Sequence, residues 1–172
     1  SSVQKFNVNA PLQKILFGSC SNQDKPMPIF DAINKEQSDL FIFLGDNVYG
    51  DTKNMQELAD KYQRLGKNKG FAQLRKTTPL IAIWDDHDFG PDNSDRSFVN
   101  KDLTLEAFKL FWSNPTYGIN GKPGTTTFFK WNDVDFFLLD DRYYRSPDNR
   151  ENTRKVEFGE DQIEWLIDAL SF

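Results

Sequence analysis

The chain has 172 residues, of which 38% are hydrophobic and 15% aromatic, and a formal net charge of −5. This composition excludes a disordered chain, because it supplies enough apolar surface for a core, and the length suits one domain or part of one. The basic residues are scattered, which argues against specific nucleic-acid binding. A single cysteine excludes an intrachain disulfide, and no apolar run is long enough to span a bilayer.

Strands and helices alternate along the first two thirds of the chain. The predicted elements are a strand at 14–19, a helix at 28–36, a strand at 39–44, a helix at 55–65, a short helix at 71–76, a strand at 79–84, a helix at 101–112, strands at 125–131 and 134–139, and a helix at 159–170. Gly66 and Gly70 are predicted to interrupt the second helix. This order predicts an α/β fold with a mainly parallel sheet, followed by a β-hairpin and a C-terminal helix.

The last predicted helix is amphipathic. Its apolar residues fall on one face at helical spacing, namely Ile163, Leu166, Ile167 and Leu170. Such a stripe is typical of a helix that lays one face on a core.

Two polar clusters each follow an apolar run directly. Residues 44–51 (Leu-Gly-Asp-Asn-Val-Tyr-Gly-Asp) follow one predicted strand, and residues 84–90 (Trp-Asp-Asp-His-Asp-Phe-Gly) follow another. Loops at the carboxyl ends of parallel strands line the ligand crevice, so several carboxylates, a phenol and the chain's one histidine would meet at one edge of the sheet. So many acids repel one another unless a cation lies among them, which points to a metal centre.

Each candidate residue also has an ordinary structural interpretation. Asp46 could cap a turn and Tyr49 could pack in the core, since Gly-Asp is common in turns. Cys20, at the end of the first predicted strand, could be a small buried residue rather than a thiolate ligand. The segment with Asp86 and His87 could be a solvated acidic loop, although its aromatic neighbours would desolvate it.

Two arginines follow the second hairpin strand. Arg142 or Arg145 could hold a phosphate with two parallel hydrogen bonds. Equally, an arginine here could neutralise Asp140 or Asp141 in a structural ion pair. The sequence has no glycine-rich phosphate loop and no serine nucleophile elbow, which argues against a P-loop protein and a serine hydrolase.

Five segments in this order resemble the PhoD-like alkaline phosphatase/phosphodiesterase family of the metallophosphoesterase superfamily. They are residues 18–20, 44–51, 84–90, 138–145 and 159–166. The resemblance implies a four-layer α/β/β/α sandwich with a metal centre at the strand ends, and hydrolysis of phosphate monoesters or diesters. It also implies a periplasmic or secreted protein, although no signal peptide is visible.

The resemblance implies a set of metal ligands by position. They are Cys20, Asp46, Tyr49, Asp86 and Asn93. Asp46 would be shared between two ions, Asp86 stands where the superfamily commonly has an asparagine, and Asp92 could replace Asn93. The implied cofactors are two or more metal ions, iron plus calcium, with zinc, manganese or magnesium as alternatives.

Two residues are the predicted catalytic groups. His87 stands at the position of the family's histidine, which acts on the phosphate or the leaving group. Arg142 is the candidate for holding a phosphate-ester substrate.

The family completes its metal site with a C-terminal Asp/His segment, whereas this chain has one histidine. We therefore predict that residues 1–172 are a single partial catalytic domain, half of the four-layer sandwich. A complementary C-terminal half would be a second chain or a removed segment. Strands 127–131 and 134–139 would then leave an apolar face without a partner layer.

The favoured function is metal-dependent hydrolysis of phosphate mono- or diesters by a dinuclear centre, part of which the missing segment supplies. The alternative is an inactive metal-binding or assembly subunit that kept the phosphoesterase scaffold. A calcium-stabilised structural domain is a third possibility.

Overall fold

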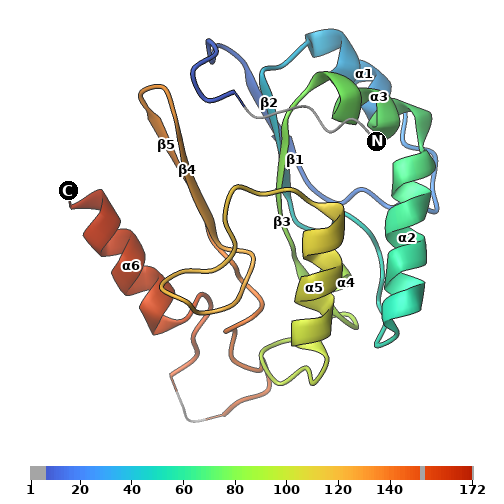
Figure 1. Cartoon of the computed structure of the whole chain (residues 1–172). Coiled ribbons are helices and arrows are strands. Elements are labelled where there is room, and N and C mark those ends of the chain that lie inside the picture. Colours follow the sequence, from blue (N-terminus) through green and yellow to red (C-terminus); the bar gives the residue numbers. More distant parts are fainter. Residues whose placement is uncertain (1–6, 152–153, 172) are drawn as a thin grey trace.

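A computed structural model of the chain describes residues 7–151 and 154–171. Figure 1 shows its elements, which are β1 (Ile15–Gly18), α1 (Ile29–Glu36), β2 (Leu40–Leu44), α2 (Met55–Lys67), α3 (Lys69–Thr77), β3 (Leu80–Ile83), α4 (Asp86–Phe89), α5 (Lys101–Phe111), β4 (Thr127–Trp131), β5 (Val134–Leu138) and α6 (Glu160–Leu170). The fold is mixed α/β, with a parallel sheet, an antiparallel hairpin and a C-terminal helix, as the sequence predicts.

The parallel sheet has the strand order β1-β2-β3, with β2 in the middle. Leu16 pairs with Phe41 on one side, and Phe41 pairs with Leu80 on the other. The central strand is buried over residues 40–43 and becomes exposed only at Leu44, where its carboxyl end meets solvent. This parallel arrangement brings the ends of all the strands of the sheet to one edge.

One face of the sheet packs against the helices. Phe41, Phe43 and Trp84 contribute to an aromatic core with residues from α1, α2, α3 and α5. Phe71 of α3 is completely buried in this core, and its ring centroid is 5.8 Å from that of Phe43 in an edge-on arrangement. Edge-on contacts between rings are favourable beyond the apolar area that they bury.

The other face of the sheet packs against the hairpin. Leu40, Ile42 and Ile81 form a second core with a set of hairpin residues, namely Phe129, Trp131 and Leu138. Beyond the hairpin lies α6, whose Trp165 ring is 5.7 Å from that of Phe137. The layer order in Figure 1 is therefore helices, sheet, hairpin and α6, which confirms the α/β/β/α arrangement. The outer face of the hairpin is covered only in part, because Phe137 contacts α6 whereas Phe128 on the same face is 40% exposed.

Two local predictions are also wrong. Gly66 does not interrupt α2, and Gly70 lies inside α3. The break falls at Asn68, whose backbone is extended and whose side chain accepts the Phe71 N–H and so starts the next helix.

The orientation of α6 also differs from the prediction. Ile163, Ile167 and Leu170 are exposed, whereas Gln162 is buried. The apolar stripe of this helix therefore faces outward. Among the described residues, none of the helices combines the length and apolar character that crossing a bilayer requires.

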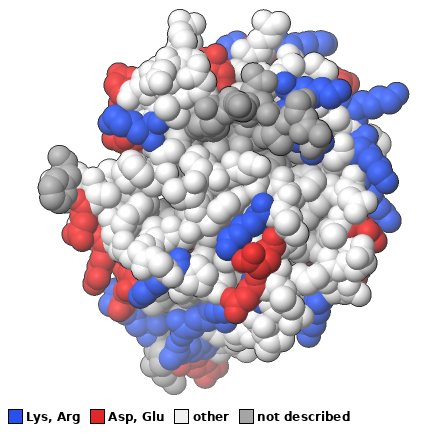
Figure 2. All heavy atoms as spheres, in the orientation of Figure 1, with Lys and Arg blue, Asp and Glu red and all other residues white. Residues whose placement is uncertain are grey.

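The charges on the surface are dispersed. Figure 2 shows Lys and Arg side chains mostly around the rim of one face, whose centre is largely uncharged. No broad basic surface of the kind that nucleic-acid binding requires is visible on this face.

Candidate metal centre

The loops that follow β1 and β2 are joined by backbone hydrogen bonds. Cys20 N donates to Gly45 O at 3.2 Å, and Ser21 N donates to Asp46 O at 2.9 Å. Cys20 and Asp46 both adopt left-handed backbone conformations, with φ of 63° and 50°. Such conformations are unfavourable for residues with a side chain and gather at functional sites, where the surroundings hold them in place.

Gly45 lets the loops after β2 and β3 come close together. Its φ is +95°, and an added Cβ would lie 2.6 Å from the Asp85 Cβ. A larger residue there would separate Asp46 from the segment that carries Asp86 and His87.

Residues 86–89 form the short helix α4 rather than a loop. Asp85 and Asp88 make a capping box at its start. Asp88 is completely buried and also accepts hydrogen bonds from the Asn47 backbone N–H at 3.0 Å and side-chain amide at 2.7 Å. Asp86 is buried as well, so the solvated-loop interpretation does not hold.

The structure brings five of the predicted site residues together at the carboxyl ends of the strands. Ligand atoms of Asp46, Asp86 and His87 all lie within 4.8 Å of one another. Cys20 Sγ lies 3.6 Å from Asp46 Oδ2, and the ring centroids of Tyr49 and His87 are 4.2 Å apart. Asp46 Oδ1 is buried and has no hydrogen-bond partner among the described residues.

Two groups of this cluster, Asp46 and Tyr49, have pKa values above the ordinary ones. Burial, with added repulsion from Asp85, raises the pKa of Asp46. Burial, together with the charge of Cys20, raises the pKa of the Tyr49 phenol to about 12. A bound cation would reverse both shifts, since it favours carboxylate and phenolate over their protonated forms. The donor set and the unpaired oxygen therefore fit a metal ion.

Asp86 is held differently. Burial alone would raise its pKa, but the Asn93 backbone N–H, which donates at 2.7 Å, and the Arg142 charge outweigh this and lower it. Asn93 has a φ of 58°, and its side-chain amide donates to Asp92 at 2.9 Å. Asn93 therefore contacts Asp86 through its backbone N–H, which donates to the Asp86 carboxylate.

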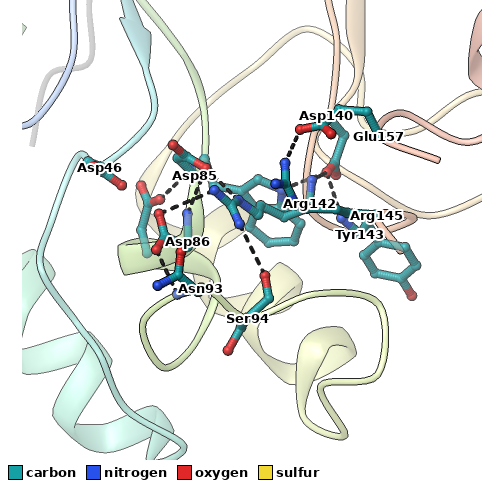
Figure 3. Close-up of polar contacts among 12 residues, drawn as sticks. Asp46, Asp85, Asp86, Asn93, Ser94, Asp140, Arg142, Tyr143, Arg145 and Glu157 are labelled. Atoms are coloured by element: carbon teal, nitrogen blue, oxygen red, sulfur yellow. Dashed lines mark hydrogen bonds and ion pairs between the residues drawn. The ribbon is translucent and has the colours of Figure 1, made fainter. Parts of the chain in front are cut away.

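Arg142 reaches the same edge from the loop after β5. Its Nε lies 2.5 Å from Asp85 Oδ1, and its Nη2 lies 3.4 Å from Asp86 Oδ1, as Figure 3 shows. Arg142 therefore forms its direct ion pairs with Asp85 and Asp86, and the charge of Asp141, an acid that the structural alternative named, also raises the pKa of its guanidinium. Arg145 is occupied elsewhere, in ion pairs with Glu157 and Asp148.

Sequence reasoning missed the role of Asp51. Its Oδ1 lies 2.6 Å from His87 Nδ1, while its backbone N–H donates to His87 O at 3.2 Å. Burial lowers the pKa of His87, but Asp51 outweighs this and the pKa is raised. Asp51 ends the first polar cluster, and that position was the available signal. A second group of possible ligands consists of Asp51, His87 and Asp92.

Comparisons with known proteins agree with this geometry. A family model described as PhoD-like phosphatase matches residues 15–172. A solved structure of PhoD matches with a TM-score of 0.76 at 18% sequence identity, covering 94% of this chain. The chain spans only 40% of the length of that protein's chain. No curated protein matches the sequence. Because the family model matches most of the chain, the chain belongs to the PhoD-like phosphatase family.

Proposed function

We propose that this chain carries much of the active site of a metal-dependent phosphoesterase that hydrolyses phosphate mono- or diesters at a centre of two metal ions. The observation that carries the proposal is the convergence of Asp46, Asp86 and His87 around a buried carboxylate oxygen that has no hydrogen-bond partner in the described part of the chain. Membership of the PhoD-like phosphatase family supports the reaction class.

The proposed ligands divide by chemistry. Cys20 and Tyr49 would offer sulfur and phenol oxygen, which suit iron, whereas Asp86 and the side-chain amide oxygen of Asn93 would suit calcium, and Asp46 would be shared. Zinc, manganese and magnesium remain alternatives. When bound, such ions supply Lewis acidity toward the phosphoryl oxygens.

His87 is the proposed general acid. Asp51 occupies its Nδ1, which leaves Nε2 for the oxygen of the leaving group. The raised pKa of His87 favours the protonated form that a general acid needs. In this arrangement Asp51 orients the ring and stabilises its charge.

Arg142 is the proposed phosphate-binding residue. Its guanidinium presents five N–H donors in a fixed plane, of which Asp85, Asp86 and the Ser94 carbonyl use three. The remaining donors can reach an anionic oxygen next to Asp86. The ion pairs with the two acids keep the side chain extended toward the centre.

We further propose that a complementary polypeptide segment completes the domain. The strand β1 lies at an edge of its sheet, where its outer backbone groups can accept a further strand. Phe17 on β1 is 70% exposed, and Ile167 and Leu170 on α6 are 58% and 66% exposed. A cavity of about 530 Å³ also opens between β1 and α1. Apolar surface in these places is typical of a contact with another segment. We also propose a periplasmic or secreted location, as the family resemblance implies.

The experiment compares the purified chain with its His87→Ala variant on aryl phosphate mono- and diesters, with each candidate metal. Any second polypeptide that copurifies is kept in the assay. We expect metal-dependent turnover that falls about 10²–10⁴-fold in His87→Ala, with metal content retained. Gln73→Ala, an exposed change on α3, is the control. Metal binding without turnover under every condition would favour the inactive metal-binding subunit instead.

A further inference from the structure

Asp140 is a buried acid outside the metal centre that the proposed reaction does not use. It has 0% exposure, and its carboxylate accepts four hydrogen bonds. Oδ1 accepts from Trp84 Nε1 and from the backbone N–H groups of Arg142 and Tyr143, each at 2.9 Å. Oδ2 accepts from Thr125 N at 2.7 Å. One carboxylate therefore joins the end of β3, the approach to β4 and the loop after β5.

The chain makes room for this arrangement at Gly124. This residue has a φ of +143°, and an added Cβ would lie 2.9 Å from Asp140 Oδ2. Any side chain at this position would push the carboxylate away from the Thr125 N–H.

The backbone of Asp140 is in turn held by Gln162 of α6. Gln162 Oε1 accepts from Asp140 N at 2.8 Å, and Nε2 donates to Asp140 O at 2.8 Å. The same side chain donates to Phe158 O at 2.7 Å and accepts the Thr126 hydroxyl. Gln162 is 2% exposed, and it is the residue that α6 buries in place of its apolar stripe.

This network connects the two segments that carry Arg142 and the acids with which it forms ion pairs. Trp84 directly precedes Asp85 and Asp86, and Arg142 lies two residues after Asp140. The distance between the Arg142 guanidinium and the two acids is therefore set by bonds to one buried carboxylate. In Figure 3, Asp140 lies on the side of Arg142 away from Asp46 and Asp86.

We propose that Asp140 and Gln162 are positioning residues that hold the Arg142 guanidinium against the edge of the metal centre. The inference rests on the proposed phosphate-binding role of Arg142. A buried glutamine that satisfies both backbone groups of a neighbouring residue fixes that residue more tightly than apolar packing does, because its hydrogen bonds are directional.

A double-mutant cycle on kcat/KM tests the coupling, with Gln162→Met, Arg142→Met and the two combined. Gln162→Met should lower kcat/KM roughly 10- to 100-fold, the range that misplacing a substrate-binding group costs. In the Arg142→Met background the same change should have little further effect. If Gln162→Met lowers kcat/KM by the same factor in both backgrounds, its role is purely structural and the proposal fails.

Thr126→Val is the matched control, because it removes a hydrogen bond to Gln162 without touching Asp140. It should lower the melting temperature and leave the coupling to Arg142 intact. Asp140→Asn, which keeps the shape of the side chain, replaces Gln162→Met in the cycle if that variant does not fold.

A second readout needs no activity. The Arg142 Nε–H donates to Asp85, so proton–nitrogen correlation spectra should show it protected from exchange in the parent chain and in Thr126→Val. In Gln162→Met the signal should shift or exchange faster, and an unchanged signal would overturn the proposal. If the parent chain hydrolyses no ester, the proposed function fails, whereas this spectrum still decides whether Gln162 positions Arg142.

Discussion

The aromatic core lies on one face of the parallel sheet and the acidic edge lies at the carboxyl ends of its strands, yet the two regions follow different rules. In the core, Phe71 is completely buried and its ring meets those of Phe30 and Trp112 edge-on, so packing and local preference agree. At the edge, Cys20 and Asp46 have left-handed backbones, and a buried oxygen of Asp46 has no hydrogen-bond partner within residues 7–151 and 154–171. The difference indicates that the edge is shaped for a ligand, whereas the core is shaped for stability.

The largest effect should come from Asp46→Asn. The change removes the ligand proposed to lie between two ions, so turnover should fall by about 10³-fold or more, which corresponds to several kcal/mol of transition-state stabilisation. Without metal, the free energy of unfolding of the variant should be at least that of the parent chain. In the parent chain, Asp85 repels the Asp46 carboxylate, and the variant lacks this repulsion. Activity assays and urea unfolding measure the two effects, with exposed Asp31→Asn as the control. A large loss of metal-free stability would place Asp46 with the core instead.

Phe71→Ala should show the opposite behaviour. Deleting a completely buried ring typically costs about 3–5 kcal/mol of unfolding free energy. Added metal should stabilise this variant by as much as it stabilises the parent, because Phe71 lies in the helical layer. Urea unfolding with and without metal checks both points. A loss below about 1 kcal/mol would mean that the core tolerates the cavity and that the two regions are less distinct.

A smaller effect is expected for Asp51→Asn. Asp51 raises the pKa of His87, so its removal lowers that pKa and the imidazolium is lost at lower pH. The alkaline fall in kcat should therefore move to lower pH, and activity near neutrality should drop about 10- to 100-fold, as for other residues that orient a functional histidine. A pH profile of kcat for both proteins measures the shift. Coincident alkaline limbs would exclude His87 as the acid that Asp51 supports.

The smallest effect is expected for Asp24→Asn, which cuts a link between the loop after β1 and α2. Hydrogen bonds from Lys61 and Arg64, at 2.8 Å and 2.6 Å, lower the pKa of Asp24 to about 2. Because the folded pKa lies below the ordinary value, the stabilisation is complete at neutral pH and disappears as pH falls from about 5 toward 2. Solvent screening should keep it below about 1 kcal/mol. Melting temperatures of both proteins that differ at pH 7 and coincide at pH 2 would agree with this.

Sequence patterns predicted the strands and the convergence of the site well. Apolar runs such as residues 39–44 and 79–84 have few alternatives to buried strands, and parallel strands bring the residues that follow them to one edge. Cys20, Asp46 and His87 come together for that reason.

Individual side-chain contacts, local or distant, could not be predicted in this way. The helix break at Asn68 depends on one side-chain cap, and α2 continues through Gly66 despite the low helix propensity of glycine. The orientation of α6 follows the hydrogen bonds of Gln162 rather than the apolar stripe. Asp51 meets His87 across 36 residues, a contact that depends on the conformations of two loops.

The most direct test of the central claim is a calorimetric titration of the metal-stripped chain with calcium, zinc, manganese and iron ions. If the acidic edge is a metal centre, at least one of these ions should bind stoichiometrically and release protons, because burial raises the pKa of the Tyr49 phenol to about 12 and keeps it protonated without metal. Asp46→Asn should lose this binding, whereas Asp31→Asn should retain it. Equal binding by Asp46→Asn, or no binding by the parent chain, would contradict the account.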